Sequence, residues 1–343
     1  MKKYFLLIAL ITLFNSPAQF EDLFASGNDA ELFINKYTTP VFKGLMYASN
    51  AGWVTSAKPI KAFHFELNIG ASGALIPTEA ENFQFNPADY QYLQVESGPS
   101  LIPTVMGGPS STIMKIEIPD NNGNEVKVLE FNAPDGIKNE IPVNAVPAPS
   151  IQASMGLPLG TEVNLRYAPK IVTSDGAFIQ LLGIGLKHSL SQYFPAGKDE
   201  NGKKNKRHFN LAAHASFQNI GAGYDDPNSD KAAHLNINTI SLQGIASFDY
   251  KFLSLYSAVG YSKGFSSLDF LGTYSFTYDV QDNNGNHLRN ENVSVIDPLQ
   301  LKYDLNGMKA KFGFKLKLYF FRIFADYTIQ EYPVATAGIG FKI

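Results

Sequence analysis

The chain of 343 residues contains no cysteine, which excludes a disulfide framework, thiolate metal sites and thiol catalysis. It has a single tryptophan, and charged residues make up only 17% of it. The 28 basic and 31 acidic side chains give a formal net charge of −3, so no basic surface for nucleic acid is expected. Long hydrophobic runs are also missing. The apolar run at residues 4–14 is too short for a transmembrane helix, which needs about 20 residues.

The first residues have the pattern of a secretory signal peptide. Lys2 and Lys3 precede the apolar run, and residues 16–18 place small side chains at the −3 and −1 positions of a cleavage site. We therefore expect an exported protein whose mature chain begins at Gln19. A retained N-terminal anchor is the alternative. If the mature protein enters a membrane, it must cross the membrane with strands.

Apolar and polar side chains alternate with a period of two along much of the chain, which predicts half-buried strands. The sharpest pattern sets Met308, Ala310, Phe312, Phe314, Leu316 and Leu318 against Lys309, Lys311, Lys315 and Lys317. Residues 62–76 and 334–343 show the same period. In a soluble sheet such an apolar row would need a second sheet to cover it, whereas a barrel in lipid presents the row outward and has no free edge.

The predicted fold class is therefore all-β, a transmembrane antiparallel β-barrel of about 12 strands (range 10–14) with a short N-terminal helical segment. Residues 62–76 and 146–343 supply the strands, each of which needs about 9–11 residues plus a connection. The expected organisation is a signal peptide at 1–18, an N-terminal segment at 19–61 and a barrel at 62–343, with a large insertion at 77–145. Residues 262–308 leave the strand parity open.

The N-terminal segment reads as a helix that begins at Asn28 and is interrupted at Pro40, with a second turn at 41–46. Two placements are open for this segment: a plug inside the lumen, or a periplasmic helix that leans on the barrel rim. The candidate plug residues are Phe33, Phe42 and Trp53. The insertion contains two short β-like runs, at 112–118 and 125–131, separated by an Asn-rich turn.

The candidate lumen-lining residues are the polar members of the alternating rows. They are His64, Glu66, Arg166, His214, Lys309, Lys311, Lys315 and Lys317. Their charges either bias a pore toward anions or pair with the plug and hold it. His64 and Glu66 lie two apart on one face, but no third ligand completes a metal site. We expect no metal and no cofactor.

Residues His214 and Ser216 are the best enzymatic candidates, because a histidine two residues from a serine could act as its base. Some outer-membrane lipid hydrolases use such a pair on the outward, lipid-facing side of the barrel. Here the pair shares its face with Asn210 and Gln218, whereas Phe209 and the other apolar residues of this stretch occupy the opposite face. The pair is therefore predicted to face the lumen. We expect no catalytic residue and no enzyme.

Several stretches resemble an uncharacterised family of Bacteroidota outer-membrane proteins. They are the Ser-Pro-Ala-Gln end of the signal at 16–19, Gly156–Glu162, Gly183–Ser189 and the ending Ala337–Phe341. The resemblance covers most of the mature chain, and its motifs are structural rather than catalytic. In layout the chain is more distantly similar to the long-chain fatty-acid channels, whose N-terminal segment plugs the barrel. The glycines at 183 and 185 are interpreted as easing strand curvature.

The expected location is the outer membrane, and the expected function is passive transport or capture of a small hydrophobic or anionic ligand through a plugged lumen. One alternative is a structural or surface-interaction barrel that acts through loops at 77–145, 198–207 and 281–296. A second alternative is a lipid-modifying enzyme. Outer-membrane lipid is the expected partner. Nucleic acid is not an expected partner, and the sequence leaves protein partners open.

Overall fold

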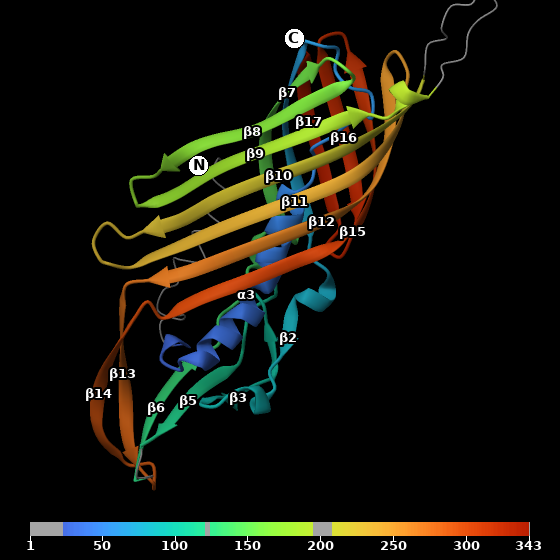
Figure 1. Ribbon diagram of the computed structural model, residues 1–343. Coiled ribbons are helices and arrows are strands. Elements are labelled where there is room, and N and C mark those ends of the chain that lie inside the picture. Colours follow the sequence, from blue (N-terminus) through green and yellow to red (C-terminus); the bar gives the residue numbers. More distant parts are fainter. Residues whose placement is uncertain (1–22, 121–123, 195–207, 343) are drawn as a thin grey trace, which may run out of the picture.

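The computed structural model describes residues 23–120, 124–194 and 208–342 (Figure 1). The predicted signal peptide, Gln19 and the loop predicted at 198–207 lie outside the described residues. The helix α3 (Asn28–Ser49) is followed by short 3-10 turns η1 (Thr78–Ala80), η2 (Pro87–Asp89), η3 (Lys138–Glu140) and η4 (Ser191–Tyr193). No helix in the described ranges has the length and apolar character needed to cross a membrane.

Ten antiparallel strands close into a barrel in the order β1-β17-β16-β15-β12-β11-β10-β9-β8-β7. Their bounds are β1 (Phe65–Leu75), β7 (Ala145–Leu157), β8 (Thr161–Val172), β9 (Ala177–Ser189), β10 (Phe209–Asp225), β11 (Ala232–Asp249), β12 (Leu253–Leu271), β15 (Leu299–Leu318), β16 (Phe321–Ile329) and β17 (Val334–Lys342). The all-β barrel is confirmed and ten strands lie within the expected range, but a count of about twelve is not confirmed. Strands such as β15, with 20 residues, are about twice as long as a spanning strand requires, so the same residues make fewer strands.

The two faces of strand β15 exchange their apolar and polar side chains halfway along its length. Before Gly307 its buried side chains are apolar and its exposed ones are polar: Leu299, Leu301, Tyr303 and Leu305 against Gln300, Lys302, Asp304 and Asn306. After Gly307 the rows exchange, so that Lys309, Lys311 and Lys315 are buried while Met308, Phe312 and Phe314 are exposed. The same inward face therefore meets an apolar core at one end of the strand and a polar lumen at the other.

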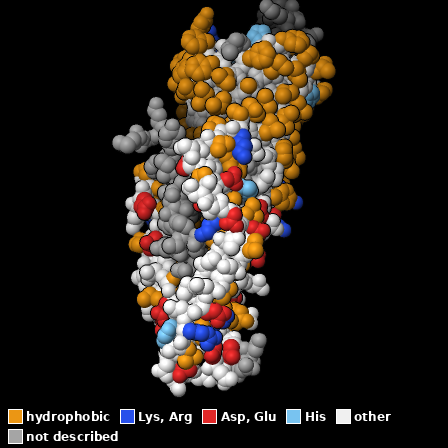
Figure 2. All heavy atoms as spheres, turned by 90° about the vertical axis from the view of Figure 1, so that its left-hand side faces the viewer, with side chains coloured by type: hydrophobic (Ala, Val, Ile, Leu, Met, Phe, Trp, Pro, Cys, Tyr) orange, Lys and Arg blue, Asp and Glu red, His pale blue; other side chains and the backbone are white. Residues whose placement is uncertain are grey.

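The neighbouring strands reverse at matching positions, which gives the barrel an apolar outer band near one end (Figure 2). We call this the apolar band. Its exposed members include Phe65, Ile69, Leu165, Ile184, Leu186, Phe217, Leu242, Phe248, Leu255, Val259, Phe312, Phe314, Ile323, Tyr327 and Ile339. This is the end at which β1 starts and β17 finishes, and we call it the hairpin end. A tight turn there exposes Tyr319 and Phe320.

The opposite end of the barrel carries a cap. A five-stranded sheet has the order β14-β13-β6-β5-β3, and a two-stranded sheet pairs β2 with β4. The bounds are β2 (Asn82–Gln84), β3 (Leu93–Ser97), β4 (Leu101–Pro103), β5 (Ile113–Pro119), β6 (Glu125–Asn132), β13 (Thr273–Asp282) and β14 (His287–Ile296). The strands predicted at 112–118 and 125–131 are confirmed as β5 and β6.

The loop predicted at 281–296 is wrong, because these residues are mostly the returning strand of a hairpin. Asp282–Asn286 supplies the turn, and β14 pairs with β13 along its length. Strand β13 in turn pairs with β6 of the insertion, and Arg289 bonds Glu125 across the sheet. Two segments separated by more than 100 residues thus build one sheet, which local turn signals could not predict.

The expected interruption of the N-terminal helix at Pro40 is also wrong. Helix α3 runs unbroken from the cap into the barrel, with Pro40 inside it. The missing N–H of a proline costs a helix one hydrogen bond, but α3 is buried on most sides, and packing stabilises helices more than propensity does. Phe33 lies against Phe83 in the cap, and Phe42 lies against Tyr303 in the barrel wall.

The start of α3 is tied to the cap by Asp29. Its buried carboxylate accepts hydrogen bonds from the backbone N–H groups of Gln91, Tyr92 and Leu93, at 2.9, 2.6 and 2.9 Å. Because hydrogen bonds to a charged acceptor are stronger than neutral ones, this residue fixes the cap on the helix.

Replacing Asp29 with alanine should destabilise the cap by about 2–4 kcal/mol, because three buried N–H groups lose their charged acceptor. The measurement is the rate of thermolysin cleavage within 76–145 over a urea series. Glu31→Ala, an exposed carboxylate two residues later on the same helix, is the matched control and should resemble the wild type. Equal cleavage of both variants would contradict this role for Asp29.

Candidate ligand site and lumen

Residues 50–61, which we call the lumen segment, connect α3 to β1 without regular structure. Their backbone groups are bonded by side chains of the barrel wall. Gln152, Lys311 and Lys187 donate to the carbonyls of Trp53, Val54 and Ser56, while Ser247 and Glu162 accept from the N–H groups of Ala57 and Ile60. An irregular chain in a protein interior needs such partners, so the polar lumen wall is built to hold this segment.

Arg166 on β8 is the central contact between the wall and the segment. Arg166 is 2% exposed, and its guanidinium donates to the carbonyls of Ser49 at 2.9 Å and Ala51 at 2.8 Å, and to Gln152 at 3.0 Å. Two of these acceptors lie at the carboxyl end of α3, where the helix dipole favours a cation. The guanidinium also lies 3.9 Å from the ring centroid of Trp53.

Trp53 lies in the lumen against two glycines of β9. A Cβ at Gly183 would lie 2.9 Å from the indole, and one at Gly185 would lie 2.8 Å from His214 and 3.2 Å from the indole. The structure thus gives these glycines a different role from the predicted one: they make room for Trp53. The ring of His214 lies 6.0 Å from that of Trp53.

Three of the four candidate lysines have carboxylate partners inside the barrel, at 3.4 Å for Lys315–Glu66, 4.0 Å for Lys311–Asp326 and 3.1 Å for Lys317–Asp249. Lys187, which was not a candidate, pairs with Glu162 at 2.8 Å. Lys309 differs, because it forms no ion pair or hydrogen bond with any described residue and faces a cavity of about 10 Å³ beside Trp53. The geometry therefore favours lysines that hold the lumen segment over lysines that line an open pore.

Two predicted site residues lie elsewhere. His64 is exposed and precedes β1, because Phe63 has a φ of 63° and breaks the alternation that placed His64 beside Glu66. Phe33 lies in the cap rather than in the lumen. His214 and Ser216 are buried inside the barrel, and Nδ1 of His214 lies 3.1 Å from Gln243. Among the described residues no cluster of His, Cys, Asp or Glu could hold a metal ion.

A second clamp lies at the cap end of the barrel. Glu331, between β16 and β17, accepts hydrogen bonds from Lys43 at 2.7 Å and Tyr47 at 2.8 Å, both on α3. Burial raises the pKa of Glu331, but these two donors outweigh it, so the pKa lies below its ordinary value. The C-terminal third of the helix is therefore fixed to the wall by Glu331 as well as by Arg166.

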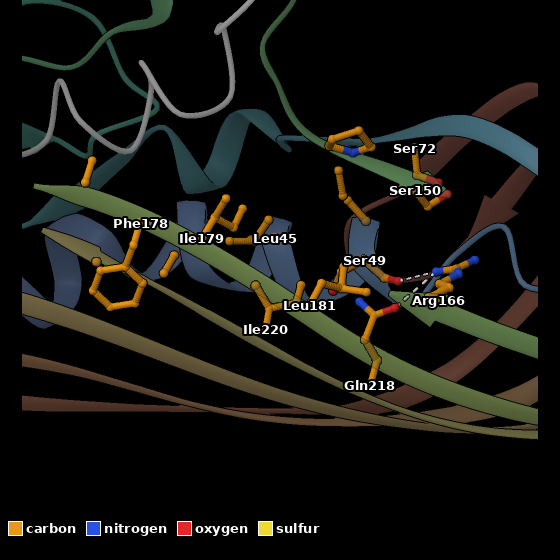
Figure 3. A pocket seen from close by; sticks show the side chains of 16 residues that line it. Leu45, Ser49, Ser72, Ser150, Arg166, Phe178, Ile179, Leu181, Gln218 and Ile220 are labelled. Carbon is orange, nitrogen blue, oxygen red and sulfur yellow. Dashed lines mark hydrogen bonds between the residues drawn. The ribbon is translucent and has the colours of Figure 1, made fainter. Parts of the chain in front are cut away.

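A cavity of about 70 Å³ lies between α3 and strands β7–β10 (Figure 3). Its apolar walls are Leu45, Ala48, Ala148, Pro149, Ala177, Phe178, Ile179, Leu181, Ile220 and Ala222, and its polar end is formed by Ser49, Ser72, Ser150, Arg166 and Gln218. Of these residues, only Arg166 was a candidate from the sequence. The only other sequence feature that indicates the cavity is the presence of small inward residues such as Ala148 and Ala222, which leave space next to a helix.

The family model described as "Family of unknown function (DUF6588)" matches residues 1–343, and the chain belongs to this family. The comparison with curated proteins finds no match.

Similar solved structures include three bacterial proteins. The translocator domain of autotransporter NalP from Neisseria meningitidis is 8% identical, with a TM-score of 0.27 and coverage of 83% of this chain and 90% of that chain. The outer membrane protease OmpT from Escherichia coli is 10% identical, with a TM-score of 0.28 and coverage of 84% and 100%. The outer membrane channel DcaP of Acinetobacter baumannii is 9% identical, with a TM-score of 0.18 and coverage of 83% and 100%. Likeness at this level carries no argument about function.

Replacing Arg166 with methionine should loosen the lumen segment, because each charge-assisted hydrogen bond lost contributes about 1.5–3 kcal/mol. In planar bilayers the wild type should be closed, Arg166→Met should show openings at least ten times as often, and Arg166→Lys should fall between them. Unchanged heat-modifiable gel mobility would show that each variant is folded. Equal conductance of wild type and Arg166→Met would contradict the clamp.

Proposed function

We propose that this DUF6588 protein is an outer-membrane β-barrel that captures a small, largely apolar ligand in the cavity beside α3, within a lumen closed by residues 50–61. One observation carries the proposal: an apolar cavity with a buried guanidinium at its polar end lies inside a barrel with an apolar outer band. Protein pockets for small molecules commonly combine apolar walls with a few fixed polar groups.

The apolar band supports a place in a lipid bilayer. On β15 the outward apolar row extends over 308–318, which matches the about 9–11 residues that a spanning strand needs. Barrels of this kind have short turns on the periplasmic side and longer loops outside. In this orientation the hairpin end faces the periplasm and the cap lies at the cell surface.

The charges of the lumen favour a ligand with an anionic group. The inward cations Arg166, Lys187, Lys309, Lys311, Lys315, Lys317 and Arg322 outnumber the carboxylates Glu66, Glu162, Asp249 and Asp326. Arg166 touches both the cavity and the lumen segment. An anionic group that takes its N–H donors would compete with the carbonyls of Ser49 and Ala51, so capture would loosen the closure.

A surface-interaction barrel is the second candidate, because the cap forms a sheet of its own. Its edge strand β14 has mostly exposed side chains and pairs with β13 on one side. An exposed edge strand is a template for pairing with another chain. A source in Bacteroidota and a likeness to fatty-acid channels remain predictions. A lipid-modifying enzyme is less favoured, because His214 and Ser216 face the lumen.

A charge placed on the apolar band should destabilise the protein in lipid. Phe312→Lys, near the middle of the band, should cost about 2–4 kcal/mol, because it puts an ammonium group in hydrocarbon. Asn306→Lys lies on the same outward row beyond the reversal at Gly307 and should cost little. Urea unfolding in phospholipid vesicles measures both. If both substitutions cost the same, lipid does not surround the band.

The orientation can be tested with single cysteines, since the native chain has none. Glu31→Cys on α3 should react with a membrane-impermeant maleimide on intact cells, because the cap faces outward. Tyr319→Cys, 94% exposed at the hairpin end, should react only after the outer membrane is broken. The reverse pattern would show that the cap lies in the periplasm.

Filling the cavity should abolish capture. Ala222→Phe on β10 places a ring in the cavity, and binding of the probe N-phenyl-1-naphthylamine should fall at least tenfold. Ala215→Phe, outward on the same strand, is the matched control and should bind as the wild type does. Because overpacking costs about 1–3 kcal/mol, heat-modifiable mobility must show that Ala222→Phe is folded. Unchanged binding by folded Ala222→Phe would refute capture in this cavity.

A further inference from the structure

The barrel wall opens between β7 and β8. Their ladder runs only from Leu157↔Thr161 to Gln152↔Arg166. Beyond that point β7 continues to Ala145 beside β1, while β8 continues to Val172 beside β9. Figure 1 shows β8 and β9 extending away from β7 toward the left of the view. We call the gap between residues 145–151 and 167–172 the seam.

Prolines on both strands keep the seam unpaired. The carbonyl of Asn144 accepts from Ile76, so the even-numbered positions of β7 bond toward β1 and the odd-numbered ones face the seam. Pro147 and Pro149 are odd-numbered and have no N–H to offer to β8. On β8, Pro169 lies where the register with β9 shifts. Because these prolines have no N–H group to leave unbonded, the unpaired edges cost fewer hydrogen bonds at these positions.

One edge of the seam lines the cavity. Pro149 and Ser150 come from β7, while on the other side the lining comes from Arg166, the last residue of β8 paired with β7, and from Ala177 and Phe178 on β9. The cavity therefore lies directly behind the missing part of the wall.

The β8 edge of the seam exposes apolar side chains and lies next to the apolar band. Tyr167 is 60% exposed, and Ile171 and Val172, which point to opposite faces of the strand, are 56% and 59% exposed. Tyr167 pairs with Leu182, the last outward apolar residue of β9 before the exposed Gln180. Beside them Lys170 lies 4.0 Å from the ring centroid of Phe178. In the proposed orientation the seam opens at the level of the outer leaflet, where a cation faces lipid head groups.

We propose that the seam is a lateral entrance through which one alkyl chain of an anionic amphiphile passes from the outer leaflet into the cavity. The cavity volume of about 70 Å³ holds about five water-sized groups, which suits the end of a single chain. Lys170, exposed on the β8 edge of the seam, and Arg166, buried in the lumen, favour an anionic head group. This inference rests on the proposed capture function and adds its route and its substrate class.

The test uses two matched cysteine variants in proteoliposomes. Ala148 and Ala258 are both buried, at 6% and 4% exposure, but only Ala148 lines the cavity behind the seam. N-dodecylmaleimide, which partitions into the bilayer, should modify Ala148→Cys at least ten times faster than Ala258→Cys. A sulfonated, membrane-impermeant maleimide should modify neither. Equal labelling after denaturation shows that both thiols are intact.

Three outcomes would overturn the lateral entrance: no reaction of Ala148→Cys with the alkyl reagent, equal rates for the two variants, or fast reaction of Ala148→Cys with the charged reagent, which would mean entry from water. The head group is tested by protection. Dodecanoate should slow the labelling of Ala148→Cys at least fivefold, whereas dodecyltrimethylammonium should not. Equal protection by both would overturn the anionic class.

Failure of the route and failure of the function can be told apart. If the wild type binds N-phenyl-1-naphthylamine and Ala222→Phe does not, ligand capture in the cavity is supported, and a lack of labelling then contradicts only entry through the seam. If the wild type binds no probe, ligand capture is refuted, and the labelling rates alone decide whether lipid chains reach Ala148.

Discussion

The closed lumen depends on how an irregular stretch of backbone is hydrogen-bonded inside a barrel. Residues 50–61 have no ladder or helix to satisfy their polar groups, and the wall supplies the partners from Arg166, Gln152, Lys187 and Lys311. Without these side chains the segment would carry unpaired carbonyls in a largely dry interior, at a cost comparable to several hydrogen bonds. The polar lumen is therefore a binding surface for the protein's own chain.

A second constraint follows from the length of the strands. Strand β15 passes through two environments, and its inward row changes from Leu301 and Tyr303 to Lys309 and Lys311 as it does so. At the cap end the inward row joins α3 and the cap in one continuous apolar core. At the hairpin end the apolar residues turn outward and form the band. One barrel thus combines a core of the soluble kind with an outer surface suited to lipid.

Several elements could be predicted from local pattern, and others could not. The alternation in 308–318 identifies both rows of β15 correctly, because side chains in a strand must alternate. The same rule fails at His64, where the left-handed residue Phe63 precedes the strand, and sequence alone gives no sign of it. Pro40 misleads for another reason: its local cost is real, but burial of α3 in the cap and the barrel outweighs it.

Part of the candidate site could likewise be predicted from the sequence, and part could not. Arg166 and the lysines are identifiable as inward polar residues, but their partners are not, because Ser49, Trp53 and Gln218 come from segments far apart in the chain. The glycines at 183 and 185 are visible in the sequence, yet only the position of Trp53 explains them.

By itself, the sequence determines that this is a β-barrel with an apolar outer row and a polar lumen, because the period of two is a property of each strand. Only the tertiary structure decides the number of strands, the closure of the lumen and the seam, because these depend on which segments meet across the barrel and where their pairing ends.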